Sequence, residues 1–434
     1  DPAFDPARVA AALHAARPVR LGRVTELRGL HMLVSGLEAA VGDMLQVLSP
    51  RPVRVEVAAS TRAGLVCLPM GETNGLRIGT LVRGTGGPLT VPVGASLRGR
   101  VLDGFGRPID SGPPLRDVEY VPVDNRAPCP MTRPRITEQV SLGVRALDTL
   151  VPCGRGQRLG IMAGSGVGKS TLLSMAARGT DASISVIALV GERGREVREF
   201  LDADLGPEGL ARSVVVVATS DAPPVERLRA AFTATRIAEW FRDSGDDVLF
   251  MMDSLTRVAM AQREVGLSAG EPPATRGYPP SVFALLPRLL ERAGASQTGS
   301  ITGLYTVLIE GDDLQDPIGD TARSVLDGHI VLSRRLATAG HFPSIDVLES
   351  ISRVANAVTD ETQRSDATTL RRLMAAHRDI RELVEIGAYV SGADPDADRA
   401  LALAPRIDAF LRQPFDSVST AADAWAALRG LMSP

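Results

Sequence analysis

The sequence predicts an α/β protein in which a mainly parallel sheet covered by helices follows a small β-barrel domain and precedes a helical domain. Three observations predict this order. Runs of β-branched residues broken by Gly, Pro and Asn come first, apolar strands alternating with longer amphipathic stretches come next, and apolar residues at helical spacing come last. With 434 residues, 44% hydrophobic and 23% charged, the chain has a globular composition and enough length for two to four domains.

The first domain is predicted over residues 18–92. Its β-branched runs at Val53–Val57, Gly64–Leu68 and Thr80–Val82 are separated by turn-forming residues, a pattern typical of a small barrel or sandwich. Residues 1–17 include an Ala-rich stretch, and we expect either a partner-binding helix or a disordered leader there.

The second domain is predicted over residues 93–360. A turn-rich segment, Gly99–Pro108, and a Pro-studded stretch, Pro113–Pro134, are expected to form a linker that wraps into it. Apolar strands then alternate with amphipathic stretches, which favours a parallel sheet between helices. The expected strands are Arg158–Ala163, Ser183–Gly191, Ser213–Ser220, Val248–Asp253, Ile301–Ile309 and His329–Leu332.

The third domain, residues 361–434, is predicted to be helical. After Asp360, apolar residues recur at roughly helical spacing through Leu370, Leu373 and Leu383, and a second helical stretch follows Asp394.

Charge and composition exclude several classes of protein. The net charge of −3 gives no global basic field, so we expect no nucleic-acid partner. The apolar runs are too short to span a membrane and the N-terminus lacks a signal pattern, which predicts a cytoplasmic protein. Three scattered cysteines, Cys67, Cys129 and Cys153, indicate neither a disulfide framework nor a zinc site and are expected to be core thiols.

The strongest motif is a glycine-rich loop between a predicted strand and a predicted helix. The strand Arg158–Ala163 runs into Gly164, Ser165, Gly166, Val167, Gly168, Lys169, Ser170 and Thr171. Backbone N–H groups of such a loop converge on phosphate oxygens at a helix N-terminus, the lysine reaches the β- and γ-phosphates, and the Ser170 hydroxyl would ligate magnesium. Lys169 is the only lysine in the chain, so this position kept a compact ammonium where arginine's planar fork would not substitute.

Three charged residues elsewhere fit the same chemistry. Asp253 ends an apolar strand and could organise the magnesium shell, although a strand-terminal Asp is often only a cap. Glu192 follows a strand directly and is placed to polarise a water against a γ-phosphate, although a solvated charge cluster would look similar. Arg353 is a candidate arginine finger for a neighbouring subunit, and one among many arginines.

Five longer runs resemble the type III protein export ATPases, which are relatives of the rotary ATP synthase β subunit. The runs are Gly191–Phe200, Asp253–Glu264, Gly270–Gly294, Tyr305–Asp320 and Leu326–Arg334, and the resemblance covers nearly all of the chain beyond Leu21. It implies a RecA-like P-loop NTPase core. Two phrases, Gly340–Pro343 and Glu349–Val354, are more similar to the flagellar branch than to the injectisome branch.

The resemblance also implies roles for individual residues. Glu192 matches the catalytic carboxylate, Arg193 an adjacent γ-phosphate sensor, and Arg257 a nearby site arginine. Lys169 and Ser170 match the phosphate-loop positions, Asp253 the magnesium-linked aspartate, and Arg353 the finger that acts across the subunit interface. Phe342 matches a ring that lines the adenine pocket, and Phe415 resembles a second one or is plain core.

The function implied is hydrolysis of ATP with magnesium, by a ring that is expected to be a homohexamer, at the inner face of the cell membrane. The implied partners are an export stator or regulator protein, a central stalk protein, export gate membrane proteins, and export substrates with their chaperones. An injectisome ATPase is the main alternative. A rotary synthase catalytic subunit, an inactive regulatory subunit and a hexameric RNA translocase are remoter, and the last lacks stacking aromatics, since Phe4 is the only Phe, Tyr or Trp before Thr90.

Overall fold

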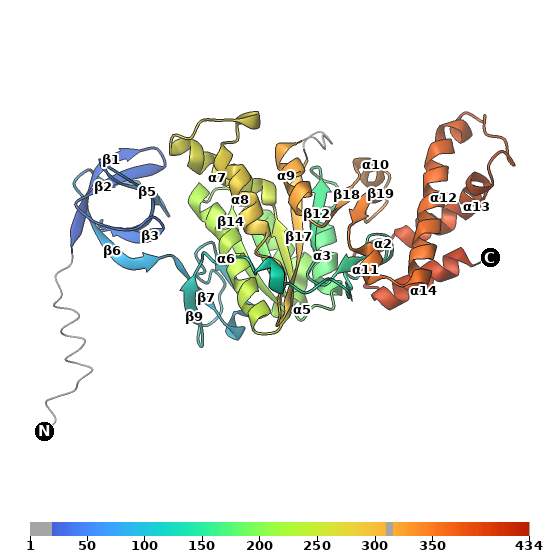
Figure 1. The fold of residues 1–434 in the computed structure, drawn as a ribbon, viewed down its shortest axis with the longest axis horizontal. Helices are drawn as coiled ribbons and strands as arrows, with labels where there is room; N and C mark the ends of the chain where they lie inside the picture. The colour runs from blue at the N-terminus through green and yellow to red at the C-terminus, as the bar shows by residue number, and fades with distance from the viewer. Residues whose placement is uncertain (1–19, 310–315, 434) are drawn as a thin grey trace, which may run out of the picture. The chain divides into compact units, whose positions relative to one another are not determined.

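The structure, a computed structural model, describes residues 20–309 and 316–433 (Figure 1). The leader predicted over residues 1–17 therefore lies outside the described residues. The chain divides into two compact units: the first ends at Thr90 and includes Ser268–Gly270, and the second holds the rest. The domain boundaries at 92/93 and 360/361 stay predictions.

The first unit is a closed β-barrel with the strand order β1-β2-β5-β4-β3-β6. Buried and exposed side chains alternate along β1 and β4, and the buried set, which includes Val24, Val34 and Val55, fills the barrel. Pairing of Leu21 with Arg83 closes it. The strands are β1 Leu21–Arg28, β2 His31–Ser35, β3 Asp43–Val47, β4 Val53–Thr61, β5 Gly64–Pro69 and β6 Leu81–Pro88.

The second unit is built on a sheet with the order β19-β18-β12-β17-β15-β13-β14-β8, in which β16 also pairs with β17. Its pairings are parallel except those of β16 and β19. Nearly continuous burial of β13 and β17 follows from helices covering both faces. The strands are β8 Val101–Asp103, β12 Arg158–Ala163, β13 Ile184–Glu192, β14 Ser213–Thr219, β15 Asp247–Asp253, β16 Gly294–Ala295, β17 Ser300–Leu308, β18 Gly328–Leu332 and β19 Ile345–Ser352.

Helix α6 packs along β13, β14 and β15, and Figure 1 shows it beside β14. Apolar residues of α3 join those on the other face of the sheet in one core. The helices of this core region are α2 Arg145–Leu150, α3 Lys169–Gly179, α4 Gly194–Glu199, α5 Gly206–Ala211, α6 Pro224–Asp243, α7 Leu255–Ser268, α8 Pro280–Leu290, α9 Pro317–Val325, α10 Arg334–Thr338 and α11 Ala355–Val358. Shorter elements are 3-10 turns at Ala95–Leu97, Pro130–Thr132 and Thr275–Gly277, a π-helical turn at Phe200–Leu205, and the strand pairs β7 Thr90–Val93 with β9 Glu119–Pro122 and β10 Gln139–Val140 with β11 Cys153–Gly154.

The expectation that Gly99–Pro108 is only a linker is wrong. Val101–Asp103 forms β8, which pairs with β14 in parallel, and Leu102 is fully buried. The strand is three residues long and lies between Gly99 and Gly106, both with positive φ, so the turn signals on either side conceal it.

The C-terminal region is helical, as predicted, and consists of α12 Glu361–Glu385, α13 Pro395–Leu411 and α14 Ala421–Met432. Asp360 and Asp394, which the sequence placed before the two helical stretches, are the N-caps of α12 and α13. Leu370 on α12 and Leu428 on α14 are fully buried in the same core as the sheet. Among the described residues, no helix combines the length and the apolar character that crossing a membrane requires.

Candidate active site

The glycine-rich loop joins β12 to α3 at the carboxyl edge of the parallel sheet. Gly166 and Gly168 have φ angles of 75° and 90°, a backbone conformation that residues with a β-carbon rarely adopt. Outside the loop, the Ser344 hydroxyl donates to the Val167 carbonyl at 2.5 Å and Arg334 donates to the Ser165 carbonyl at 3.3 Å. The loop is therefore held in shape from the β18–β19 side, where sequence reasoning found no signal.

Lys169, at the first turn of α3, lies between the two carboxylates that the sequence singled out. Its Nζ is 2.5 Å from Oδ1 of Asp253 and 3.4 Å from Oε1 of Glu192. The strand order explains the meeting. Strands β12, β17, β15 and β13 are parallel neighbours, so the loop after β12 lies at the same edge of the sheet as Asp253 and Glu192, the last residues of β15 and β13. Residues 169, 192 and 253 thus form one cluster, although 84 positions separate its ends.

Burial and charge shift the pKa values in this cluster. Burial opposes the charged form of Lys169, but the carboxylates of Asp253 and Glu192 outweigh it and hold the pKa of the ammonium above its usual value. Burial, followed by the neighbouring charge of Asp253, raises the pKa of Glu192. Lys169 therefore stays cationic, and Glu192 is a stronger proton acceptor than an exposed glutamate.

The oxygen donors around the loop fit a magnesium ion, and one nitrogen nearby lacks an acceptor. The carboxylate of Asp253 and the exposed hydroxyl of Ser170 are the hard ligands that magnesium prefers. Arg257 packs against Gly191, next to Glu192, and its buried Nε has no hydrogen-bond partner in the described structure. A buried guanidinium nitrogen without an acceptor is costly, and an anion in the site would supply one.

Arg193 lies farther out than the other candidates. Its side chain is 79% exposed and its Nη1 is 3.0 Å from Oε1 of Glu196 on the same helical turn. Arg193 therefore follows Glu192 in the sequence but extends into solvent, and among the described residues it forms no hydrogen bond or ion pair with Lys169 or Asp253.

The two candidate adenine-pocket rings lie on the α3 side of the loop. A β-carbon added to Gly168 would be 3.5 Å from the Phe342 ring, which places that ring directly beside the loop. The Phe415 ring is 5.3 Å from the guanidinium carbon of Arg178, near the end of α3. The backbone N–H of Gln413, two residues before Phe415, donates to the Phe342 carbonyl at 3.0 Å. Both rings are about half exposed, which disfavours the reading of Phe415 as plain core.

Arg353 is not part of this cluster. Ala163, at the start of the loop, is beside Leu332, whereas Ser352 pairs with Gly328 at the other end of β18. With about 3.3 Å per strand residue, roughly 13 Å of strand separates the two ends. The exposed Arg353 donates to the Arg323 carbonyl at 3.2 Å and is directed away from the phosphate loop of its own chain.

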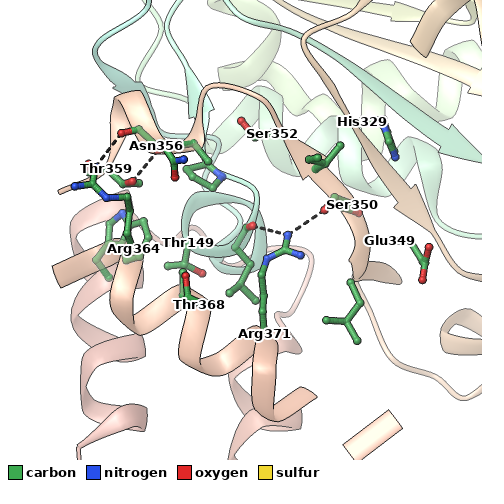
Figure 2. A pocket seen from close by; sticks show the side chains of 17 residues that line it. Thr149, His329, Glu349, Ser350, Ser352, Asn356, Thr359, Arg364, Thr368 and Arg371 are labelled. Carbon is green, nitrogen blue, oxygen red and sulfur yellow. Dashed lines mark hydrogen bonds between the residues drawn. The ribbon is translucent and has the colours of Figure 1, made fainter. Parts of the chain in front are cut away.

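A pocket of about 470 Å³ lies away from the loop, between α2, β19 and α12 (Figure 2). Arg371 enters it from α12 and donates to the carbonyls of Leu150 and Ser350, both at 2.9 Å, while Arg364 donates to the carbonyls of Asn356 and Thr359. These bonds fasten α12 to the end of the sheet. None of the predicted nucleotide-site residues lines this pocket.

A parallel sheet with a glycine-rich loop, a lysine between two strand-end carboxylates and an N-terminal barrel defines a P-loop nucleotide-binding protein. The model of the ATP synthase alpha/beta family, nucleotide-binding domain, matches residues 143–352, and that of the T3SS EscN ATPase C-terminal domain matches residues 359–430. The flagellum-specific ATP synthase of Bacillus subtilis is 48% identical, over 95% of both chains. The type 3 secretion system ATPase of Xanthomonas euvesicatoria is 49% identical, over 92% of this chain and 91% of the relative.

A solved structure agrees with the sequence relatives. The assembled ATPase EscN of the enteropathogenic E. coli type III secretion system has a TM-score of 0.91 at 44% identity and covers 95% of this chain and 100% of its own; in complex with its central stalk EscO the TM-score is 0.89. The chain therefore belongs to the ATP synthase alpha/beta family and, within it, to the flagellum-specific and type III secretion ATPases. It is an ATPase.

Proposed function

We propose that this chain hydrolyses ATP to energise flagellar type III protein export, acting as a homohexamer at the cytoplasmic face of the export gate. The observation that carries the proposal is the placement of the Lys169 ammonium between the carboxylates of Glu192 and Asp253 at the mouth of the loop. The loop from Gly164 to Thr171 would bind the phosphates, and Phe342 and Phe415 would flank the adenine.

The reaction follows from the chemistry of these groups. Lys169 exchanges its carboxylate partners for phosphate oxygens, which leaves Glu192 free to accept the proton of the attacking water. Magnesium, held by the Ser170 hydroxyl and through Asp253, would neutralise charge on the β- and γ-phosphates. Arg257, whose Nε lacks an acceptor, and Arg193 would contact the γ-phosphate.

Arg353 would complete the site of the next protomer. Its place at the far end of β18, away from its own loop, suits a head-to-tail ring in which each interface joins one loop to one finger. A finger of this kind is worth about a thousandfold or more in rate. Hydrolysis should therefore depend on assembly.

Two experiments test these roles. Glu192→Gln should keep nucleotide affinity and lose nearly all turnover, since an amide cannot accept the proton; turnover at the parental rate would remove Glu192 from the mechanism. Lys169→Ala and Arg353→Ala chains should each be inactive alone, whereas mixing them equally should restore activity at about a quarter of the interfaces. No recovery on mixing, in rings shown to contain both chains, would contradict a finger that acts between protomers.

The flagellar assignment has separate support. Relatives from flagella and from type 3 secretion systems are almost equally similar, so the choice depends on the phrases Gly340–Pro343 and Glu349–Val354. We expect the chain to restore motility to cells that lack their flagellar export ATPase, and not secretion to cells that lack their injectisome ATPase. The opposite pattern would favour the injectisome alternative.

The partners proposed are a stator or regulator protein, a central stalk protein, export gate membrane proteins, and export substrates with their chaperones. The stalk is supported by the complex of the similar ATPase EscN with its central stalk EscO. We expect no nucleic-acid partner, because the net charge is −3 and supplies no global basic field. The protein would be peripheral at the inner face of the cell membrane.

A further inference from the structure

Thr306 lies on β17, the strand between β12, which precedes the phosphate loop, and β15, which ends at Asp253. Its side chain is fully buried, and its Oγ1 is 2.7 Å from Oδ1 of Asp253 and 3.2 Å from the Met252 carbonyl oxygen. A fully buried hydroxyl of β17 therefore contacts the carboxylate proposed to organise the metal.

The hydroxyl has one proton to donate, and the carboxylate is the better acceptor. Oδ1 of Asp253 is nearer to the hydroxyl than the Met252 carbonyl oxygen is, and it carries charge. Charge-assisted hydrogen bonds are shorter and stronger than neutral ones. Oδ1 of Asp253 therefore accepts from both Lys169, at 2.5 Å, and Thr306. Within the parts of the chain that the structure describes, no donor is directed at Oδ2.

This asymmetry fixes the orientation of the carboxylate. When Lys169 moves to the phosphates, Oδ1 keeps a donor only if Thr306 remains, and Oδ2 stays without a donor among the described residues. Without the hydroxyl, a carboxylate that is only 5% exposed would lose its last neutral donor and would rotate or draw Lys169 back.

We propose that Thr306 is a positioning residue of the ATPase site, which holds Oδ1 of Asp253 so that Oδ2 faces the magnesium shell. The inference rests on the proposed roles of Asp253 and Lys169. Its competitor is a purely structural role, in which Thr306 fills space and its hydroxyl is satisfied by the Met252 carbonyl.

The test is Thr306→Val in the full chain, since valine keeps the shape and removes the hydroxyl. The readout is the affinity for a fluorescent ADP analogue, measured with and without magnesium, beside kcat and KM for ATP. We expect affinity without magnesium to change less than about twofold, and the increase in affinity that magnesium provides to fall about tenfold, as for loss of a hydrogen bond to a charged group. We also expect kcat to fall by at least the same factor while KM changes little.

Thr302→Val is the matched control. Thr302 lies on the same strand and is also buried, but its hydroxyl accepts from the Gly156 N–H at 2.8 Å, away from Asp253. It should lower stability without changing the magnesium dependence. Thr306→Ser should restore the parental magnesium dependence, whereas Thr306→Ala should not, and this pair decides the question if the valine variant does not fold.

Magnesium dependence in Thr306→Val equal to that of the parent, or an equal loss in the serine and alanine variants, would overturn the proposal. The parent chain separates this failure from failure of the proposed function. If the parent binds the analogue with a magnesium-dependent gain and hydrolyses ATP, the site is right and only the role of Thr306 is refuted.

Discussion

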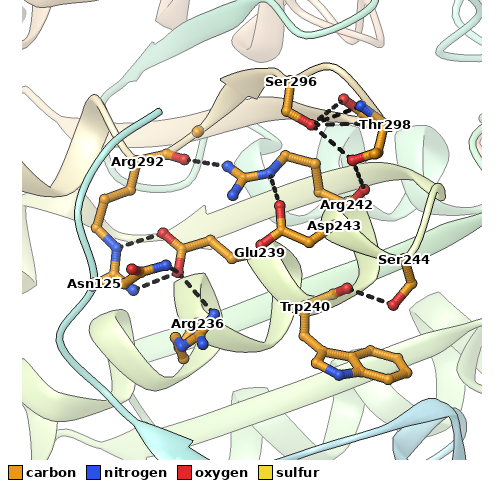
Figure 3. A network of polar contacts seen from close by, with 12 residues as sticks. Asn125, Arg236, Glu239, Trp240, Arg242, Asp243, Ser244, Arg292, Ser296 and Thr298 are labelled. Atoms are coloured by element: carbon orange, nitrogen blue, oxygen red, sulfur yellow. Dashed lines mark hydrogen bonds and ion pairs between the residues drawn. The ribbon is translucent and has the colours of Figure 1, made fainter. Parts of the chain in front are cut away.

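Replacing Glu239 tests how strongly a buried ion pair supports the ATPase core. Glu239 on α6 is fully buried and accepts from Arg292 at 2.7 and 2.8 Å and from the side-chain amide of Asn125 at 2.9 Å (Figure 3). Arg292 is 2% exposed, so Glu239→Ala would leave a buried guanidinium without its counter-ion. Removing one partner of such a pair costs about 3–5 kcal/mol.

The expected change in melting temperature follows from the size of the unit. An unfolding entropy of about 2.1 cal/mol/K per residue gives roughly 0.7 kcal/mol/K for the second unit, so Tm should fall by about 4–7 °C. Differential scanning calorimetry measures this shift. The loss of the Asn125 contact should also free part of the Pro-studded segment, which limited proteolysis would detect.

A double variant separates the ion pair from simple packing. Glu239→Met with Arg292→Met replaces both charges with side chains of similar length and should recover most of the lost stability. Glu199→Gln, which breaks an ion pair whose side chains are 82% and 60% exposed, is the control and should shift Tm by less than about 1 °C. A Tm loss in Glu239→Ala no larger than in this control would refute the reasoning.

Two further predictions concern the C-terminal helices and the cysteines. Asp360→Ala removes a reciprocal capping box with Gln363, whose two hydrogen bonds are 2.8 and 2.9 Å long. The free energy of unfolding, measured with denaturant for the parent and the variant, should fall by about 1 kcal/mol while nucleotide affinity stays the same. An unchanged free energy of unfolding would mean that α12 is held by packing alone. The native chain should consume one equivalent of a thiol reagent and the denatured chain three. Cys129 is exposed, whereas burial raises the pKa of Cys67 to about 12 and also raises the pKa of Cys153. Two fast-reacting thiols in the native chain would contradict the burial assigned to Cys67 or Cys153.

The sequence was sufficient for six adjacent strands of the sheet, from β18 to β14, and for the centre of the site, because strong local signals agree there. The predicted strand Arg158–Ala163 coincides with β12, and the other predicted core strands differ from the structure by at most a residue or two at either end. Parallel strands bring their carboxyl ends to one edge, so Lys169, Glu192 and Asp253 could be grouped before any distance was known.

What the sequence missed depends on non-local contacts. β8 is too short to show a period, and only its pairing with β14 makes it a strand. Cys129, expected in the core, is exposed because it lies in the Pro-studded segment at a 3-10 turn. Thr306 lies in a buried strand, and a role for its hydroxyl becomes visible only when the neighbouring strand is known to be β15, which ends at Asp253. A polar residue on a strand next to one that carries a predicted site residue is therefore the signal to look for in a sequence.

The arrangement of charges suggests why a free chain should be a poor enzyme. In the chain alone, the Lys169 ammonium is bound by Asp253 and Glu192, so a nucleotide must first break two charge-assisted contacts in a partly buried site. Arg353, the arginine proposed to offset the loss of these two contacts, lies at the opposite end of β18 and cannot reach the phosphate loop of its own chain. Each protomer would then contribute the phosphate loop to one ATPase site and Arg353 to another. The free energy that drives Lys169 onto the phosphates would become available only at an interface, which would tie ATP hydrolysis to assembly.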